Sequence, residues 1–250
     1  MKQYLRSGLF LLSLLALLLS GCTEAPPADA GSGEHTSSGS LTCLIVDGAG
    51  TDSLLLAEGE DGLYGGSGVY RLGTASLDNA DTLKDGMTVT MSFDGTVLET
   101  YPLQFSQATA VTPTGDAADD RCGLYLQVLE DLWEGNAGLR SEITDIGLDL
   151  SGLTDLSSSQ QDALAYAFGT RHGILPLTGT WEELAEQGYI DRENLVWKDG
   201  VFFSLNGSVE DTFSAQIWRS GLGAYFFLDC TAQMDETGSW TYTVGSEAVS

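Results

Sequence analysis

Basic side chains are scarce in this sequence. It has 10 Lys and Arg residues against 36 Asp and Glu residues, a formal net charge of −26 over 250 residues. A surface with this charge repels the phosphate backbone of nucleic acids, which excludes nucleic acid as a partner. The same charge steers cationic partners towards the protein and makes their association depend on salt.

Histidines and cofactor motifs are equally scarce. Only His35 and His172 occur, and only His172 falls in the part that we expect to fold. We find no paired histidines at metal-ligand spacing, no two-cysteine knuckle and no glycine-rich phosphate loop. The acidic stretch 78–85 lacks the central glycine and the terminal glutamate of a calcium loop. We therefore expect no metal site and no cofactor.

Long apolar runs are also lacking, except at the N-terminal end. Lys2 and Arg6 precede an apolar run over residues 8–19. The run is too short to span a bilayer as a mature helix, so we interpret residues 1–21 as a signal peptide.

The residues that close this segment, Leu19-Ser-Gly-Cys22, resemble the lipobox of bacterial lipoproteins. The resemblance implies cleavage between Gly21 and Cys22 and a diacylglyceryl group on the sulfur of Cys22. Two acyl chains anchor a protein stably, so the membrane becomes a partner and the protein sits at the outer face of the cytoplasmic membrane. Residues 22–40, rich in small residues, then predict a flexible tether of about 25 Å.

Short β-prone runs separated by glycine and aspartate clusters follow in residues 41–112. We expect strands over residues 41–47, 53–58, 69–73 and 87–93. Asp94-Gly95 predicts a tight hairpin into a strand that returns over 96–105. Five or six strands in so short a segment predict a small OB-like β-barrel, closed or partly closed, because closure removes exposed edges.

The string of residues 87–102, MTVTMSFDGTVLETYP, resembles the closing hairpin of small β-barrel domains in uncharacterised lipoproteins of Gram-positive Firmicutes. No activity is assigned to those domains. The resemblance therefore implies fold and compartment only, and it covers residues 41–112 at most.

Residues 113–120, with a proline, a glycine and three aspartates, predict a linker to a second domain over 121–250. An apolar stripe over 124–133 predicts a helix, and 143–150 a strand. Capping boxes at Ser157 and at Thr180 predict two further helices. From residue 196 onward, period-two runs predict an antiparallel meander with helices on one side. The second domain, and the chain as a whole, is therefore expected to be α+β, compatible with a cystatin-like or NTF2-like cone.

Two polar residues are candidates for chemistry. His172 is the one candidate general base in the folded part, although a cation at a helix end is also explained by the helix dipole. Asp149 lies inside an apolar strand, where it is either a site residue with a raised pKa or a hydrogen-bond partner of a neighbouring turn.

Three cysteines remain after lipidation of Cys22. Cys122 lies on the apolar helix face and Cys230 on the apolar side of a strand, so the two are expected to share a core. They form either a disulfide or buried free thiols. Cys43 is expected to be buried in the first strand, with no base beside it to make it a nucleophile.

Aromatic side chains are dense near the C-terminal end. The four that fall on the parity opposite the expected core are Phe202, Trp218, Tyr225 and Phe227. They either pack under a loop or against the barrel, or form a concave aromatic cleft for a peptide, a glycan or a small ligand.

These observations favour a binding or envelope-assembly module over an enzyme. The expected partner is an envelope protein or a cationic or glycan ligand. The alternative is an envelope hydrolase with His172 as general base, and a third reading is a domain pair that inhibits or positions a neighbouring enzyme.

Overall fold

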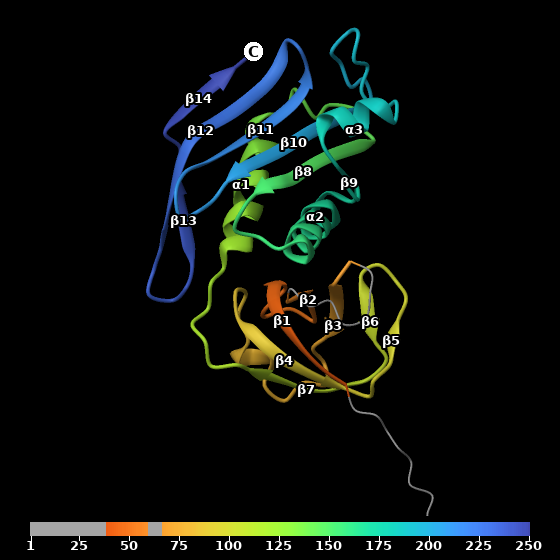
Figure 1. The fold of residues 1–250 in the computed structure, drawn as a ribbon, viewed down its shortest axis with the longest axis vertical. Coiled ribbons are helices and arrows are strands. Elements are labelled where there is room, and N and C mark those ends of the chain that lie inside the picture. Colours follow the sequence, from red (N-terminus) through yellow and green to blue (C-terminus); the bar gives the residue numbers. More distant parts are fainter. Residues whose placement is uncertain (1–38, 60–66) are drawn as a thin grey trace, which may run out of the picture. The chain divides into compact units, whose positions relative to one another are not determined.

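The computed structural model describes residues 39–59 and 67–250, which form two β-sheets with three α-helices (Figure 1). The predicted signal peptide, the lipobox with Cys22 and the tether up to residue 38 lie outside the described residues. No helix of the described part is both long enough and apolar enough to cross a membrane.

The first sheet contains seven strands in the order β5-β6-β3-β2-β1-β4-β7. The strands are β1 (Gly39–Asp47), β2 (Ser53–Glu58), β3 (Val69–Gly73), β4 (Thr88–Phe93), β5 (Val97–Leu98), β6 (Leu103–Phe105) and β7 (Ala108–Pro113). A short 3-10 helix, η1 (Ala80–Thr82), joins β3 to β4. The four strands expected between residues 41 and 93 are all present, and two of them, β2 and β3, have the predicted bounds.

Of the closed or partly closed barrel expected for this sheet, the closed form is wrong, and so is the predicted tight hairpin. The strand path is open, with β5 and β7 at its ends, so the sheet is not a closed barrel. Asp94-Gly95 does not form a two-residue hairpin either, because β4 pairs with β1 and β7 while β5 pairs with β6. The N–H of Asp94 instead donates to the carbonyl of Gln107 at 3.1 Å. This bond extends the pairing of β4 with β7 by one residue, into the predicted turn.

The second part of the chain alternates helices and strands before its final meander. Its elements are α1 (Arg121–Gly135), β8 (Asp145–Leu153), α2 (Ser158–His172), β9 (Leu177–Thr178), α3 (Trp181–Glu186), β10 (Gly200–Gly207), β11 (Phe213–Ser220), β12 (Gly223–Met234), β13 (Trp240–Thr243) and β14 (Ser246–Val249). Strands β10, β11 and β12 form the predicted antiparallel meander, while β8 and β9 add to it in parallel. The predicted α+β class is confirmed.

Local capping chemistry explains why the helices begin where they do. The hydroxyl of Ser157 accepts from the N–H of Gln160, and the side chain of Gln160 reaches back to the N–H of Ser157. Thr180 and Glu183 repeat this arrangement at α3. Both capping boxes were predicted, because each satisfies orphan N–H groups with side chains only three residues away.

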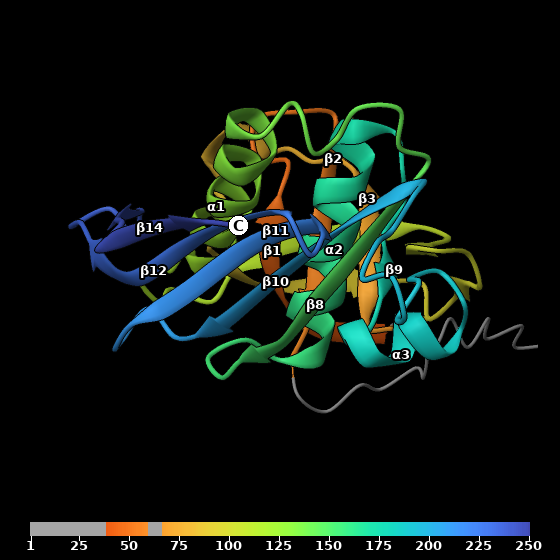
Figure 2. The same ribbon diagram turned by 90° about the horizontal axis from the view of Figure 1, so that it is seen from above.

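Three apolar clusters hold the elements together. Helices α1 and α2 pack on one face of the second sheet, and their cluster also takes in Val46, Leu55, Ala57 and Val69 of the first sheet. A second cluster fills the interior of the first sheet. A third lies beneath α3 on the opposite face of the second sheet. Figure 2 shows α3 apart from α1 and α2, so the expectation that all helices pack on one side of the meander is wrong.

A bulge in β12 changes which side chains face which core. Phe213 pairs with Cys230 and Ala215 pairs with Phe227, so β12 has one residue more than β11 between these points. Asp229 takes the extra position with a φ of 53°. Because one inserted residue reverses the alternation, Phe227 and Cys230 both lie in the α1/α2 cluster.

Candidate functional site

Three hollows lie around α2, where it packs on the first sheet. The first, of about 360 Å³, lies at the N-terminal end of the helix. The second, also about 360 Å³, lies along the C-terminal half of α2 beside the β1–β2 turn. The third, about 310 Å³, lies between α2, the segment that follows it and the β5–β6 turn. Their polar side chains decide which of them has chemistry to offer a ligand.

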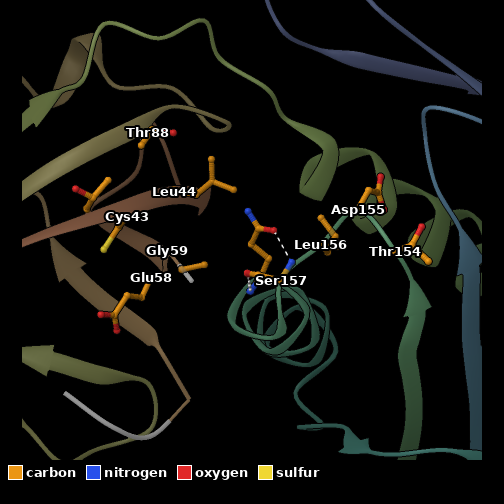
Figure 3. Close-up of a pocket in the computed structure, with 12 residues that line it drawn as sticks. Cys43, Leu44, Glu58, Gly59, Thr88, Thr154, Asp155, Leu156 and Ser157 are labelled. Atoms are coloured by element: carbon orange, nitrogen blue, oxygen red, sulfur yellow. Dashed lines mark hydrogen bonds between the residues drawn. The ribbon is translucent and has the colours of Figure 1, made fainter. Parts of the chain in front are cut away.

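The first hollow is lined by β1, β2, β4 and the loop before α2 (Figure 3). Figure 3 shows that Cys43 and Glu58 turn their side chains away from the α2 side of the hollow. Cys43 belongs to the core of the first sheet, and Glu58 accepts a hydrogen bond from the Tyr70 hydroxyl at 2.8 Å. Burial, with a smaller contribution from Glu58, raises the pKa of the Cys43 thiol to about 12, so this thiol is not a nucleophile at neutral pH.

The remaining acid of this hollow is committed to the fold. Asp155 accepts from the Tyr125 hydroxyl at 2.9 Å and from the Val209 N–H at 3.2 Å, and it lies 3.6 Å from Arg121. Ser157 is engaged in the capping box of α2. The first hollow therefore lies where the two sheets meet, and the side chains of Glu58, Asp155 and Ser157 are already hydrogen-bonded within the protein.

The second hollow combines opposite charges. Arg71 and Arg171 line it together with Asp47 and Asp52. Arg171 is 3.0 Å from Asp47. Because the formal charges cancel within the hollow, it favours neither a cation nor an anion.

The third hollow, which we call the tyrosine hollow, is formed by three separate segments. Its lining residues are Tyr101, Asp162, Ala165, Tyr166, Leu175, Pro176 and Thr178. Asp162 and Tyr166 are four residues apart on α2 and therefore neighbours on its surface. Tyr101 comes from the turn between β5 and β6.

A glycine-based turn brings the third segment into place. Gly173 ends α2 with a φ of 69°, and the N–H of Ile174 donates back to the carbonyl of Gly169 at 3.0 Å. This is the hydrogen-bond pattern of a Schellman motif. A side chain at Gly169 would lie 2.4 Å from Pro176, so glycine at this position lets Leu175 and Pro176 fold back against the helix.

Two aromatic walls and one carboxylate define the chemistry of the tyrosine hollow. The rings of Tyr101 and Tyr166 have centroids 5.6 Å apart and planes at 83°. Tyr101 is 54% exposed and Leu175 is 56% exposed, so apolar surface borders the opening. Within the part of the chain that the structure describes, the half-buried carboxylate of Asp162 has no hydrogen bond or ion pair.

The pKa shifts show that this carboxylate is partly removed from water and that no positive charge or hydrogen-bond donor of the described residues offsets this loss of solvation. Burial raises the pKa of Asp162 above its ordinary value, and no neighbouring group lowers it. Burial, then Asp162 and then Tyr166, raise the pKa of the Tyr101 phenol. A cation in the hollow would pair with Asp162 and lie against electron-rich ring faces, which together favour binding of positive charge.

His172 does not line any of the three hollows, and its ring is packed against α1. Its Nε2 lies 3.0 Å from Glu130 of α1, and its ring stacks on Trp133 at 3.9 Å between centroids. No hydroxyl or thiol of the described residues is hydrogen-bonded to it. His172 thus ties the C-terminal end of α2 to α1, in agreement with the helix-end reading.

Asp149 has a local hydrogen-bonding role, although its partner lies in its own strand β8 and not in a neighbouring turn. Its carboxylate accepts from the N–H of Ser151 at 3.0 Å and from the hydroxyl of Ser151 at 2.6 Å. These bonds lie within β8, so they link Asp149 to Ser151, two residues further along the same strand.

The three cysteines that the structure describes, Cys43, Cys122 and Cys230, are buried and free. Cys122 and Cys230 share the α1/α2 cluster as expected, and the structure has both as buried free thiols, one of the two alternatives considered. Burial is the main cause of the raised pKa of the Cys122 thiol. Burial also raises the pKa of the Cys230 thiol, to about 11. No cluster of three or more metal-ligating His, Cys, Asp or Glu side chains occurs in the described residues.

The four candidate aromatics do not form one cleft. Phe202 and Trp218 lie in the cluster beneath α3, whereas Phe227 and Tyr225 lie on the α1/α2 face. The expectation of one aromatic face is wrong, because the parity of β12 is opposite to the one we assumed.

Sequence reasoning missed the tyrosine hollow entirely. The spacing of Asp162 and Tyr166 on a predicted helix was the one available signal. Nothing in the local sequence connects Tyr101 to them, because 61 residues separate it from Asp162.

Comparison of the chain with protein-family models, with curated proteins and with solved structures finds no match. The geometry of the hollows therefore carries the functional argument.

Proposed function

We propose that this chain is a lipid-anchored extracytoplasmic protein that binds a cationic ligand in the tyrosine hollow without catalysing a reaction. The observation that carries the binding function is the half-buried carboxylate of Asp162, which has no partner among the described residues, beside the rings of Tyr101 and Tyr166. A net charge of −26 supports it, since it draws cations to the surface at a distance.

A binding role agrees better with the candidate groups than a hydrolase does. His172 is held by Glu130 and Trp133, and burial keeps the thiols protonated at neutral pH. For the fold, we propose a partly open OB-like arrangement of the first sheet and a cystatin-like or NTF2-like arrangement of the second.

The anchor is proposed from the sequence. The lipobox-like residues before Cys22 support it, with residues 23–38 as the tether, because β1 begins at Gly39. We expect the chain to incorporate an alkyne-tagged fatty acid in a bacterial host and to partition into detergent. Cys22→Ala should lose the label, and a label retained in this variant would contradict the proposed attachment site.

Binding can be tested by thermal unfolding of the purified full chain in neutral detergent with small organic cations. A ligand at 100 times its Kd adds about 2.7 kcal/mol, or about 5–10 °C for a chain of this size. We expect Asp162→Asn to weaken binding about tenfold, which corresponds to about 1.4 kcal/mol. Low salt should increase the effect.

Asp52→Asn is the matched control, because it removes one charge from the neighbouring hollow and leaves the tyrosine hollow intact. The control should bind as the unmodified chain does. If no cation shifts the transition, or if both variants bind equally well, the proposed site is wrong.

A further inference from the structure

We infer that the tyrosine hollow selects quaternary ammonium groups, the trimethylammonium head that choline carries. The inference rests on the proposed function, because it names the class of cation that the same site binds. It depends on three features of the hollow: the angle between its rings, its apolar walls and its single charge.

The two rings suit a rounded cation. Their planes meet at 83° with centroids 5.6 Å apart, so both rings can contact a tetrahedral ammonium group as two walls of a corner. A planar guanidinium group stacks on one ring face at a time. Aromatic corners of this kind are a recurrent means of binding quaternary ammonium through cation–π attraction.

The rest of the lining is part polar, through Thr178, and part apolar, and its apolar part suits methyl groups better than N–H groups. Ala165, Leu175 and Pro176 contribute apolar side chains to the lining. A primary ammonium brings three N–H donors, each of which loses water on entry and needs an acceptor. A trimethylammonium group has no donor, and its methyl groups gain contact with the apolar walls.

One carboxylate completes the match in charge. Asp162 carries one negative charge and has no cationic partner within the described residues. A monovalent cation would neutralise it without leaving further charge unpaired. Tyr101, at 54% exposed, borders the opening, so the ligand can enter without rearrangement of the core.

The test compares three small cations on the full chain by calorimetric titration. Choline and ethanolamine differ only by three methyl groups on the nitrogen, and ethylguanidinium supplies the planar alternative. We expect choline to bind at least about tenfold more tightly than either. Equal or tighter binding of ethanolamine or ethylguanidinium would overturn the selectivity and leave the cation site standing. Binding of none of them would overturn the proposed function as well.

Variants of Tyr101 separate the ring from its hydroxyl group. Tyr101→Phe should retain the preference for choline, whereas Tyr101→Leu should reduce the choline-to-ethanolamine ratio several-fold. Tyr189→Leu, at another partly exposed tyrosine, is the control and should leave the ratio unchanged. An unchanged ratio in Tyr101→Leu would contradict the role of the aromatic corner.

Free choline and lipid headgroups share this chemistry, and a competition experiment distinguishes them. The Cys22→Ala chain, loaded with choline, is mixed with phosphatidylcholine vesicles. Displacement of choline would support a bilayer headgroup as the ligand, and retention would support a free quaternary ammonium compound.

Discussion

Asp120 shows how the fold changes the chemistry of a single acid. It is the N-cap of α1 and accepts from the N–H of Gly123 at 3.1 Å. Burial raises its pKa to about 6, with smaller contributions in the same direction from Asp85, Asp47 and Asp119. The folded state therefore binds this proton more tightly than the unfolded chain, whose aspartates titrate near 3.9.

From this shift we predict that Asp120 lowers stability as the pH rises from about 4 to about 6. Asn retains the cap but carries no charge. Asp120→Asn should raise the free energy of unfolding on the order of 1 kcal/mol at pH 7 and leave it unchanged near pH 4. Urea unfolding at both pH values measures this, and an equal effect at both would contradict the assignment.

The three buried thiols lead to a second prediction at this scale. Cys43, Cys122 and Cys230 are each at most 1% exposed, so none should react with a thiol reagent in the native protein at pH 8. After denaturation without reductant, all three should react. If only Cys43 reacts after denaturation, the result would show that Cys122 and Cys230 form a disulfide, in contradiction to the free thiols of the structure.

At the scale of elements, α2 organises the hollows around it, and its start depends on one hydroxyl group. Ser157→Ala removes the N-cap and should lower the free energy of unfolding by about 1 kcal/mol. Ser158→Ala, at the next, exposed position, is the matched control and should change it little. Denaturant midpoints of the two variants give the comparison, and equal midpoints would show that the capping box adds nothing.

At the scale of the whole molecule, the shared apolar cluster predicts cooperative unfolding. Residues of the first sheet pack in the same cluster as α1 and α2, and the described residues, 39–59 and 67–250, belong to one compact unit. We therefore expect one transition for both sheets, even though the sequence predicts a domain boundary at 113–120.

Fluorescence and circular dichroism can test this directly. The tryptophans are Trp133, Trp181, Trp197, Trp218 and Trp240. All follow residue 120, so their fluorescence reports the second sheet and its helices, whereas far-ultraviolet dichroism reports both sheets. The two denaturation curves should coincide. Separate midpoints would support two independently folding domains.

Much of the secondary structure was predictable because its causes are local. The two capping boxes depend on side chains three residues apart, and strands β2 and β3 are bounded by glycine and aspartate clusters. The bulge at Asp229 was not predictable from alternation, since one inserted residue reverses the side of every residue after it. The four aromatics we had grouped are separated by the register of β12 against β11, which pairs Phe227 with Ala215 and Tyr225 with Ile217.

The sequence alone determined the α+β class, the starts of α2 and α3 and the charge, and it supplies the whole case for the anchor at Cys22. Each of these follows from composition or from residues within a few positions of one another. Only the tertiary structure decided that the first sheet stays open and that Tyr101 meets Asp162 and Tyr166. These outcomes depend on strand pairing and packing between distant segments, which short-range patterns do not encode.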